Sequence, residues 1–336
     1  MRYAGRRFIP DAPDRRGFVM TLDIPNYRVV EKLGTGAQTR IFRARCMRSG
    51  KDYAVKTLKI LRPEDNNIIE LMRAEYAIGA VIDSDYLRKV YELRMIRHRL
   101  RVRGAILFME YVDGMTMGDK DFKRPVGEVL RLFTDVAMGL HAMHLAGYVH
   151  ADIKPANIMV TSDGRVKLID FGQSARSHEA KQRIQGTIDY MAPEQAQREV
   201  LDARTDVFGL GATMHRVLTG RPVATEMNQT VNMSSQVLVG VRKDKLAGSR
   251  DGELPTPLAR MIADCCAADP ASRPPDMLAV VKRLEMVTVS LNRPVSDILD
   301  DDDDSALDEF DLDVDDDDSI SALDPTTGSG PAEEAN

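Results

Sequence analysis

The sequence is poor in several features that would assign it to other protein classes. It has only three cysteines, Cys46, Cys265 and Cys266, an odd number with one adjacent pair and no CxxC spacing. This pattern argues against a disulfide framework or a cysteine zinc site and favours a reducing compartment, the cytoplasm. The basic N-terminus has no apolar segment of the secretory type, and charges interrupt every long apolar stretch, so we expect no signal peptide and no membrane span.

The end of the chain lacks positive charge altogether. Residues 297–336 contain 17 Asp and Glu but no Lys or Arg, which leaves 35 of the 52 acidic residues against 46 basic ones elsewhere. The net charge of −6 therefore conceals a basic body followed by an acidic tail, residues 291–336, which we expect to be disordered. The tail either solubilises the chain or docks on a partner or on the basic body. No stripe of basic and aromatic residues appears, so we expect no nucleic-acid partner.

The order of the expected elements indicates the fold class. Residues 1–26 have no clear hydrophobic period and are interpreted as a flexible basic arm. Residues 27–112 read as strands with one helix at 66–81, whereas residues 113–290 read as mainly helical with a small hairpin. One helix should bury Val129, Leu132, Phe133, Val136, Leu140 and Met143. The sequence therefore predicts an α+β fold of two lobes, the first β-rich and the second α-helical.

The sharpest chemical signal lies in the segment from His150 to Asn157. A carboxylate, a lysine and an amide, Asp152, Lys154 and Asn157, fall within six residues on a proline-containing loop. In phosphoryl transfer, Asp152 is suited to accept the proton of an acceptor hydroxyl and Lys154 to neutralise the transferred group. Asn157 is suited to bind a metal through its amide oxygen. We assign His150 a packed, structural role.

Further charged residues at informative spacings fit the same chemistry. Asp170, in an Asp-Phe-Gly motif, comes 18 residues after Asp152 and is suited to bind Mg²⁺. Lys56 lies on an alternating strand, and the next helix offers Glu75 as its partner, with Glu70 as the competing candidate. Such a pair would hold the ammonium group against the α- and β-phosphates of a nucleotide.

A turn between two predicted strands, residues 33–41, contains two glycines that would let backbone amides approach phosphate oxygens. Alone, this turn is more often only a hairpin. Its strand–turn–strand setting argues against a dinucleotide-binding fold, in which a helix should follow the turn.

Together these motifs resemble the eukaryotic-like, bacterial Hanks-type serine/threonine protein kinases. The resemblance covers roughly residues 27–284 and follows the family's order: glycine turn, Tyr53-Ala54-Val55-Lys56, helix glutamate, His150-Ala151-Asp152, Asp-Phe-Gly and Ala192-Pro193-Glu194. It implies transfer of the γ-phosphoryl group of ATP to Ser or Thr of a protein substrate, with Mg²⁺, or alternatively Mn²⁺, as the ion. Phosphorylation of a small molecule and a pseudokinase scaffold without catalysis are the alternatives.

The resemblance also assigns roles to individual residues. The catalytic residues are Asp152, Lys154 and Asn157, and the metal ligands are Asn157 and Asp170. The nucleotide-binding residues are Leu33, Gly34, Thr35, Gly36, Ala37, Gln38, Thr39, Arg40, Ile41, Ala54, Lys56, Glu75, Met109, Glu110, Val112 and Met159. The resemblance implies supporting contacts between Asp206 and the segment from His150 to Asn157, here called the catalytic loop. It also implies contacts between Arg273 and Glu194, and from Thr187 to Asp152 and Lys154.

Three positions depart from the family's pattern. Thr39 replaces the third glycine of the turn, and Gly79 is small for the hydrophobic spine, so the position of its helix would need help from a partner. Ala151 replaces the arginine that receives an activation-loop phosphate, so phosphorylation of Ser174, Ser177 or Thr187 lacks its usual receiver. We therefore hypothesise activity that does not require activation-loop phosphorylation.

Overall fold

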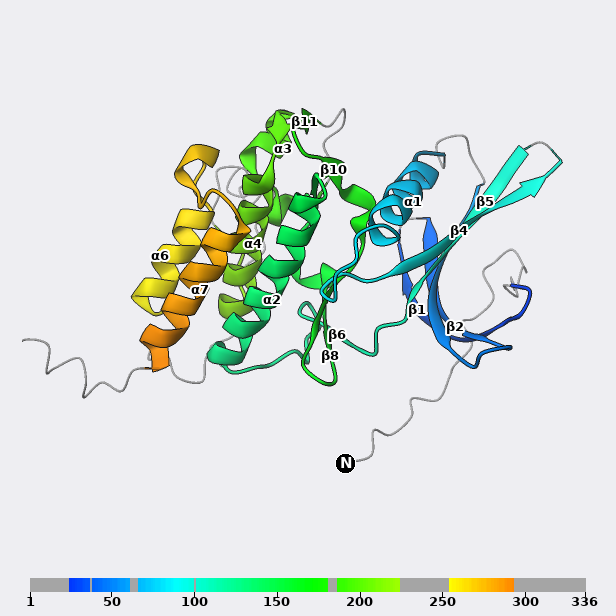
Figure 1. The fold of residues 1–336 in the computed structure, drawn as a ribbon, viewed down its shortest axis with the longest axis horizontal. Coiled ribbons are helices and arrows are strands. Elements are labelled where there is room, and N and C mark those ends of the chain that lie inside the picture. The colour runs from blue at the N-terminus through cyan, green and yellow to red at the C-terminus, as the bar shows by residue number, and fades with distance from the viewer. Residues whose placement is uncertain are drawn as a thin grey trace, which may run out of the picture. The chain divides into compact units, whose positions relative to one another are not determined.

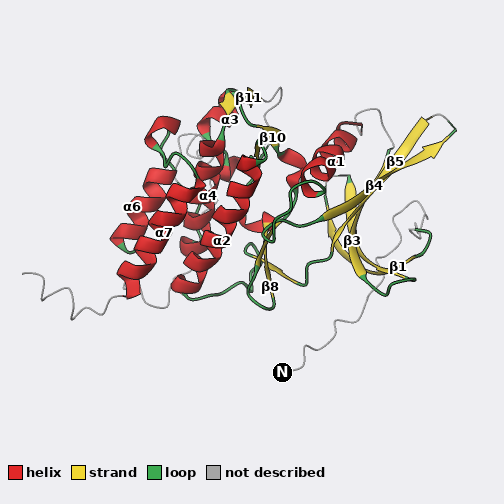
Figure 2. Cartoon of the chain, in the orientation of Figure 1, coloured by secondary structure: helices red, strands yellow, loops and turns green. Residues whose placement is uncertain are grey.

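The computed structural model describes residues 24–36, 38–60, 66–99, 101–180, 186–223 and 254–292 (Figure 1). Its first part is an antiparallel five-stranded sheet with the strand order β1-β2-β3-β5-β4. The strands are β1 (Tyr27–Thr35), β2 (Thr39–Cys46), β3 (Asp52–Lys59), β4 (Val90–His98) and β5 (Arg101–Glu110). Helix α1 (Asn66–Gly79) connects β3 to β4 and lies beside the sheet in Figure 2.

Alternation along β3 determines which side chains of the sheet meet α1. Ala54 and Leu58 pack in one cluster with Ile69 and Met72 of α1, whereas Val55 packs in a cluster on the opposite face. Because successive side chains of a strand point to opposite faces, Lys56 shares the face of Ala54 and Leu58 and is directed toward α1. The strand period therefore places the lysine beside the helix glutamates.

Packing on the opposite face begins before Tyr27. Ile24 is buried against Ala44, Val55 and Phe108, although the sequence assigned it to the flexible arm. Burial of the apolar Ile24 side chain on the second face of the sheet stabilises the fold, even though the residues around it have no regular hydrophobic pattern. Residues 1–23 and 293–336 lie outside the described residues. The predicted tail began at residue 291, but residues 291 and 292 belong to the last helix, α7 (Met277–Asn292).

The second part of the chain is mainly helical, as predicted. Its long helices are α2 (Val126–Leu145), α4 (Ala203–Thr219), α6 (Thr256–Cys265) and α7 (Met277–Asn292), with the short α3 (Pro193–Gln197) between α2 and α4. All six residues of the predicted buried face of α2 are in the core. No helix in the described part of the chain has both the length and the apolar character needed to cross a bilayer. The α+β prediction with a β-rich first part is therefore confirmed.

Short strands hold the loops of the helical part in place. The strands β6 (Gly114–Thr116), β8 (Ile158–Thr161) and β9 (Val166–Leu168) form a three-stranded sheet in the order β6-β8-β9. Two smaller pairs join β7 (Tyr148–Val149) to β10 (Ala175–Arg176) and β11 (Glu179–Ala180) to β12 (Val200–Leu201). The β7–β10 pair joins the chain on both sides of the segment that carries Asp152 and Asp170.

Gly79 is explained by the close approach of the chain that leads into β4. A Cβ atom at Gly79 would lie 2.3 Å from Val90 Cγ2 and 3.2 Å from the carbonyl oxygen of Arg88. Val90, which is buried, thus occupies the space that a larger residue 79 would fill. Another part of the same chain therefore fills the space beside Gly79, and the small residue alone gives no reason to expect a partner protein at this position.

Candidate active site

The loop that carries Asp152 has an unusual backbone held by a buried carboxylate. Ala151 has a φ of 58°, in the left-handed region that non-glycine residues seldom adopt. The backbone N–H groups of His150 and Ala151 each donate to Asp206 at 2.8 Å, and His144 Nε2 lies 2.7 Å from the same carboxylate. Burial alone would raise the pKa of Asp206, but His144, His150 and the Ala151 N–H together outweigh it, and the pKa is lowered. An ionised Asp206 therefore braces the loop, as the resemblance implied.

The Asp152 carboxylate is oriented by its neighbours on both oxygens. Lys154 Nζ donates to Asp152 Oδ2 at 2.7 Å and to Thr187 Oγ1 at 2.9 Å. The Thr187 N–H donates to Asp152 Oδ1 at 3.2 Å. Asn157 Nδ2 donates to the backbone carbonyl of Asp152 at 2.8 Å and to its carboxylate at 3.2 Å. Asp152 is therefore a largely buried acceptor with a fixed direction.

A second charged cluster joins the sheet to the Asp-Phe-Gly segment. Lys56 Nζ donates to Glu75 Oε2 at 2.7 Å and to Asp170 Oδ1 at 3.3 Å. Glu70 instead lies on the exposed side of α1 beside Arg73, so Glu75 is the partner of Lys56. Burial raises the pKa of Asp170, but the positive charges of Lys56 and Arg88 outweigh it and lower the pKa. Asp170 is therefore held as a carboxylate.

The two clusters are linked through the backbone. The Ile169 N–H donates to the carbonyl oxygen of Asn157 at 2.9 Å, so the chain before Asp170 runs beside the end of the catalytic loop. Because the Asn157 amide nitrogen is committed to Asp152, the amide oxygen is the atom suited to a metal. Amide and carboxylate oxygens fit Mg²⁺, which takes its remaining ligands from water and phosphate. Within the described ranges, no cluster of three or more His, Cys, Asp or Glu could form a separate metal site.

The glycine turn is closed by its atypical threonine. The Gly36 N–H donates to the carbonyl oxygen of Thr39 at 2.8 Å. A Cβ atom at Gly36 would lie only 2.7 Å from Thr39 Oγ1, so the Thr39 side chain packs onto the glycine that precedes it in the turn. Thr39 is buried, whereas Leu33, Thr35, Gln38 and Arg40 are exposed. Ala37 lies outside the described residues.

The residues expected around the adenine come from both parts of the chain. Ala54 and Met109 are paired neighbours on β3 and β5, and both are buried. Met159 lies on β8, in the helical part, and is half-buried. Glu110 is already engaged through its side chain, since it accepts from the Lys89 N–H at 3.1 Å and lies 3.3 Å from Lys167 Nζ. Val112 follows β5 and is buried.

The supporting role of Gln195 was missed in the sequence. The Gln195 side chain donates to the carbonyl oxygen of Ala151 at 2.9 Å and accepts from the Ala192 N–H at 3.1 Å. It therefore ties the start of α3 to the catalytic loop without any charged group. Its position directly after Glu194 was the available signal, but a glutamine next to a motif is usually exposed.

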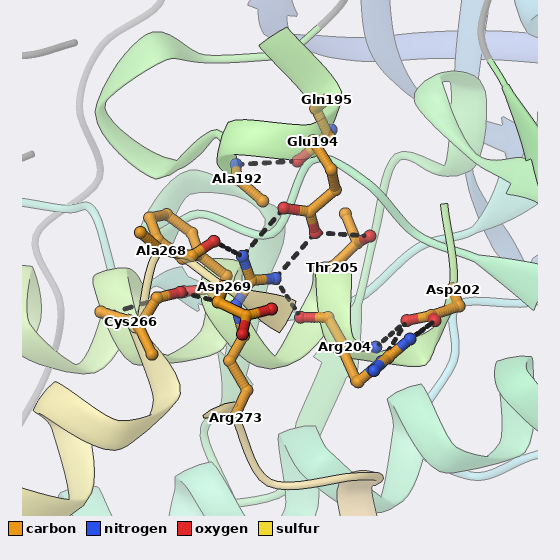
Figure 3. Close-up of polar contacts among 12 residues, drawn as sticks. Ala192, Glu194, Gln195, Asp202, Arg204, Thr205, Cys266, Ala268, Asp269 and Arg273 are labelled. Carbon is orange, nitrogen blue, oxygen red and sulfur yellow. Dashed lines mark hydrogen bonds and ion pairs between the residues drawn. The ribbon is translucent and has the colours of Figure 1, made fainter. Parts of the chain in front are cut away.

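A buried ion pair anchors α3 from below (Figure 3). Arg273 donates to both carboxylate oxygens of Glu194, at 2.7 and 2.8 Å, and Thr205 Oγ1 donates to the same carboxylate at 2.9 Å. Arg273 also donates to the carbonyl oxygens of Ala267, Ala268 and Arg204. Both charges are thus fully hydrogen-bonded within the core, which is the condition for a buried pair to be stable.

Comparisons with known proteins agree with this arrangement. The protein kinase domain family matches residues 27–283. Serine/threonine-protein kinase PknB of Mycobacterium tuberculosis is 30% identical over 278 residues, covering 80% of this chain but 43% of that protein. PknB of Mycobacterium leprae is 29% identical, with the same two coverages. The probable serine/threonine-protein kinase SCO3848 of Streptomyces coelicolor is 32% identical, covering 58% of this chain and 30% of that protein. The chain, which spans less than half the length of these curated relatives, belongs to the protein kinase domain family.

Proposed function

We propose that this chain is a serine/threonine protein kinase that transfers the γ-phosphoryl group of ATP to hydroxyl groups of protein substrates. The observation that carries the proposal is the Asp152 carboxylate, oriented by Lys154, Asn157 and Thr187. The relatives it matches carry names of serine/threonine kinases, which supports the same choice of acceptor. The cytoplasmic location expected from the cysteine content stays a prediction.

Each charged residue has a distinct task in the proposed reaction. Asp152 orients the acceptor hydroxyl and accepts its proton, while Lys154 neutralises charge on the transferred phosphoryl group. Lys56, directed by Glu75, binds the α- and β-phosphates. Asn157 and Asp170 would hold Mg²⁺, or Mn²⁺ in its place, which supplies neutralisation of the phosphate charge when bound.

The proposal is tested by incubating the purified chain with Mg²⁺, ATP labelled on the γ-phosphate and a generic basic protein, beside Lys56→Met. We expect label transfer by the natural chain and a loss of at least about 100-fold in the variant, because one phosphate-positioning cation is gone. A pseudokinase scaffold, which binds nucleotide or partner proteins without catalysis, would transfer no label in either sample. Transfer to a small molecule but to no protein would favour the other alternative.

Contacts that need no phosphate support the proposal of activity without activation-loop phosphorylation. Gln195 ties the start of α3 to Ala151, and Thr187 is hydrogen-bonded to both Lys154 and Asp152. These contacts hold Thr187 and the start of α3 against the segment that carries Asp152, although Ala151 stands where the usual arginine is missing.

We therefore expect that treatment with a phosphatase, followed by its removal, leaves the initial rate of transfer within about twofold of the untreated enzyme. The measurement is the initial rate with fresh ATP, and mass spectrometry verifies that Ser174, Ser177 and Thr187 carry no phosphate. A fall to background after phosphatase treatment would contradict this part of the proposal.

The acidic residues 297–336 lie outside the described residues, and their role rests on charge alone. Docking on the basic body or on a partner protein and simple solubilisation remain the two interpretations. Deleting these residues separates them, since solubilisation predicts an unchanged rate and substrate range.

A further inference from the structure

The α1 carboxylate that aligns Lys56 is held by a second cation. Arg88 Nη2 donates to Glu75 Oε1 at 2.8 Å, while Lys56 donates to the other oxygen, Oε2, at 2.7 Å. The side chain of Glu75 has an exposed fraction of 0% and that of Arg88 only 7%. Glu75 is therefore shared between two cations that come from different elements, one from β3 and one from the segment between α1 and β4.

Arg88 is fixed in place independently of α1. Its backbone N–H donates to the carbonyl oxygen of Leu168 at 2.9 Å, and the Leu168 N–H donates to the carbonyl oxygen of Tyr86 at 2.7 Å. These bonds attach the Arg88 segment to β9, two residues before Asp170. A buried Arg88 thus connects the position of α1 to the strand that carries Asp170.

Burial of the Arg88 guanidinium group costs free energy of folding, so a gain in stability does not explain why an arginine stands at this position. Within the described residues, the Nε of Arg88 is buried and has no hydrogen-bond partner. Apolar side chains of similar volume generally serve a core at least as well as a buried ion pair. A cation retained at such a site, with one donor unsatisfied, points to a role beyond packing.

The reaction itself provides that role. In the proposed reaction, Lys56 donates to phosphate oxygens as well as to Glu75. The phosphates therefore compete with the wholly buried Glu75 carboxylate for the Lys56 ammonium group. A buried carboxylate needs a charged partner at all times. Arg88 supplies this partner without leaving its place, so Glu75 and α1 keep their position while Lys56 engages the nucleotide.

We propose that Arg88 is a positioning residue for phosphoryl transfer. It holds Glu75, and with it α1, in the position that aligns Lys56, and this contact adds to the one that Lys56 itself makes with Glu75. The inference rests on the proposed function for its kinetic consequence, but its structural consequence can be measured without any activity. It also explains how α1 is held in a chain that lacks the usual receiver of a loop phosphate.

The kinetic test compares the natural chain with Arg88→Met and Arg88→Lys. We expect Arg88→Met to lower kcat by about tenfold or more, with KM for ATP changed by less than about threefold, because the residues around the adenine are untouched. Arg88→Lys, which keeps the charge, should recover part of kcat. Arg73→Met is the matched control, since Arg73 pairs with Glu70 on the exposed side of the same helix, and it should leave kcat unchanged.

The structural test measures hydrogen exchange of the α1 amides in Lys56→Met and in Lys56→Met combined with Arg88→Met. Protection should persist in the single variant and fall in the double variant, while protection of α2 in the same samples verifies that the chain is folded. Equal α1 protection in both variants, or a kcat of Arg88→Met within about twofold of the natural value, would overturn the proposal. An inactive natural chain would refute the proposed function, and the exchange comparison would still decide the role of Arg88.

Discussion

Replacing Asp152 by asparagine is expected to lower kcat by about 10²–10⁴-fold, the range that positioned general bases contribute. The amide keeps the size of the carboxylate but cannot accept the proton of the acceptor hydroxyl. It also loses the ionic contact with Lys154 Nζ at 2.7 Å, so Lys154 is no longer held in place by charge. Both effects act on the transfer step, and we expect ATP binding to be retained.

The measurement is the rate of phosphoryl transfer under saturating ATP, together with the equilibrium binding of ATP by each protein. Asp163→Asn is a suitable control because Asp163 is an exposed carboxylate on the turn between β8 and β9, and the chemical change is the same. A variant Asp152→Asn that retained more than a tenth of the natural rate would be incompatible with Asp152 as the base.

Replacing Arg273 by methionine is expected to lower the free energy of unfolding by about 3–5 kcal/mol, because Glu194 would remain buried without its charged partner. The loss includes both bonds to the Glu194 carboxylate and the bonds to the carbonyl oxygens of Ala267, Ala268 and Arg204. Chemical denaturation measures the change. Thr205 would still donate to Glu194, but a neutral hydroxyl cannot balance the buried charge.

Arg283→Met provides the matched control for Arg273→Met. Arg283 on α7 pairs with Asp264 on α6 at 2.8 Å, and both side chains are about 40% exposed, at 39% and 44%. Since exposed ion pairs contribute about 0–1 kcal/mol, this variant should unfold at nearly the natural denaturant concentration. Equal losses from the two substitutions would show that the Glu194–Arg273 pair is not the anchor of α3.

The sequence was most informative where local patterns decide the structure. The spacing of apolar residues predicted the buried face of α2. In the short segment from His150 to Asn157, the polar residues of the site are already neighbours in the sequence. The sequence offered Glu75 as the partner of Lys56 and Glu70 as the competing candidate, and only the three-dimensional structure decides between them. Both glutamates lie on α1, but only one faces β3.

Buried polar residues that depend on distant partners could not be predicted from the sequence. Arg88 and Lys89 are adjacent basic residues that the sequence does not distinguish, yet Arg88 is buried on Glu75 whereas Lys89 is exposed. The segment leading into β4 buries one of these side chains and exposes the other. The position of α1 gives Arg88 a buried carboxylate partner, whereas Lys89 pairs with the exposed Asp83. The burial of Ile24 on the second face of the sheet could likewise not be predicted, because the residues around it have no regular hydrophobic pattern.

The most direct test of the proposed chemistry is the identity of the phosphorylated product. The purified chain is incubated with Mg²⁺, γ-labelled ATP and a generic basic protein, beside Asp152→Ala, and the labelled amino acids are separated after hydrolysis. We expect phosphoserine or phosphothreonine with the natural chain and background label with the variant. Label transfer that is unaffected by Asp152→Ala would contradict the assignment of Asp152 as the base.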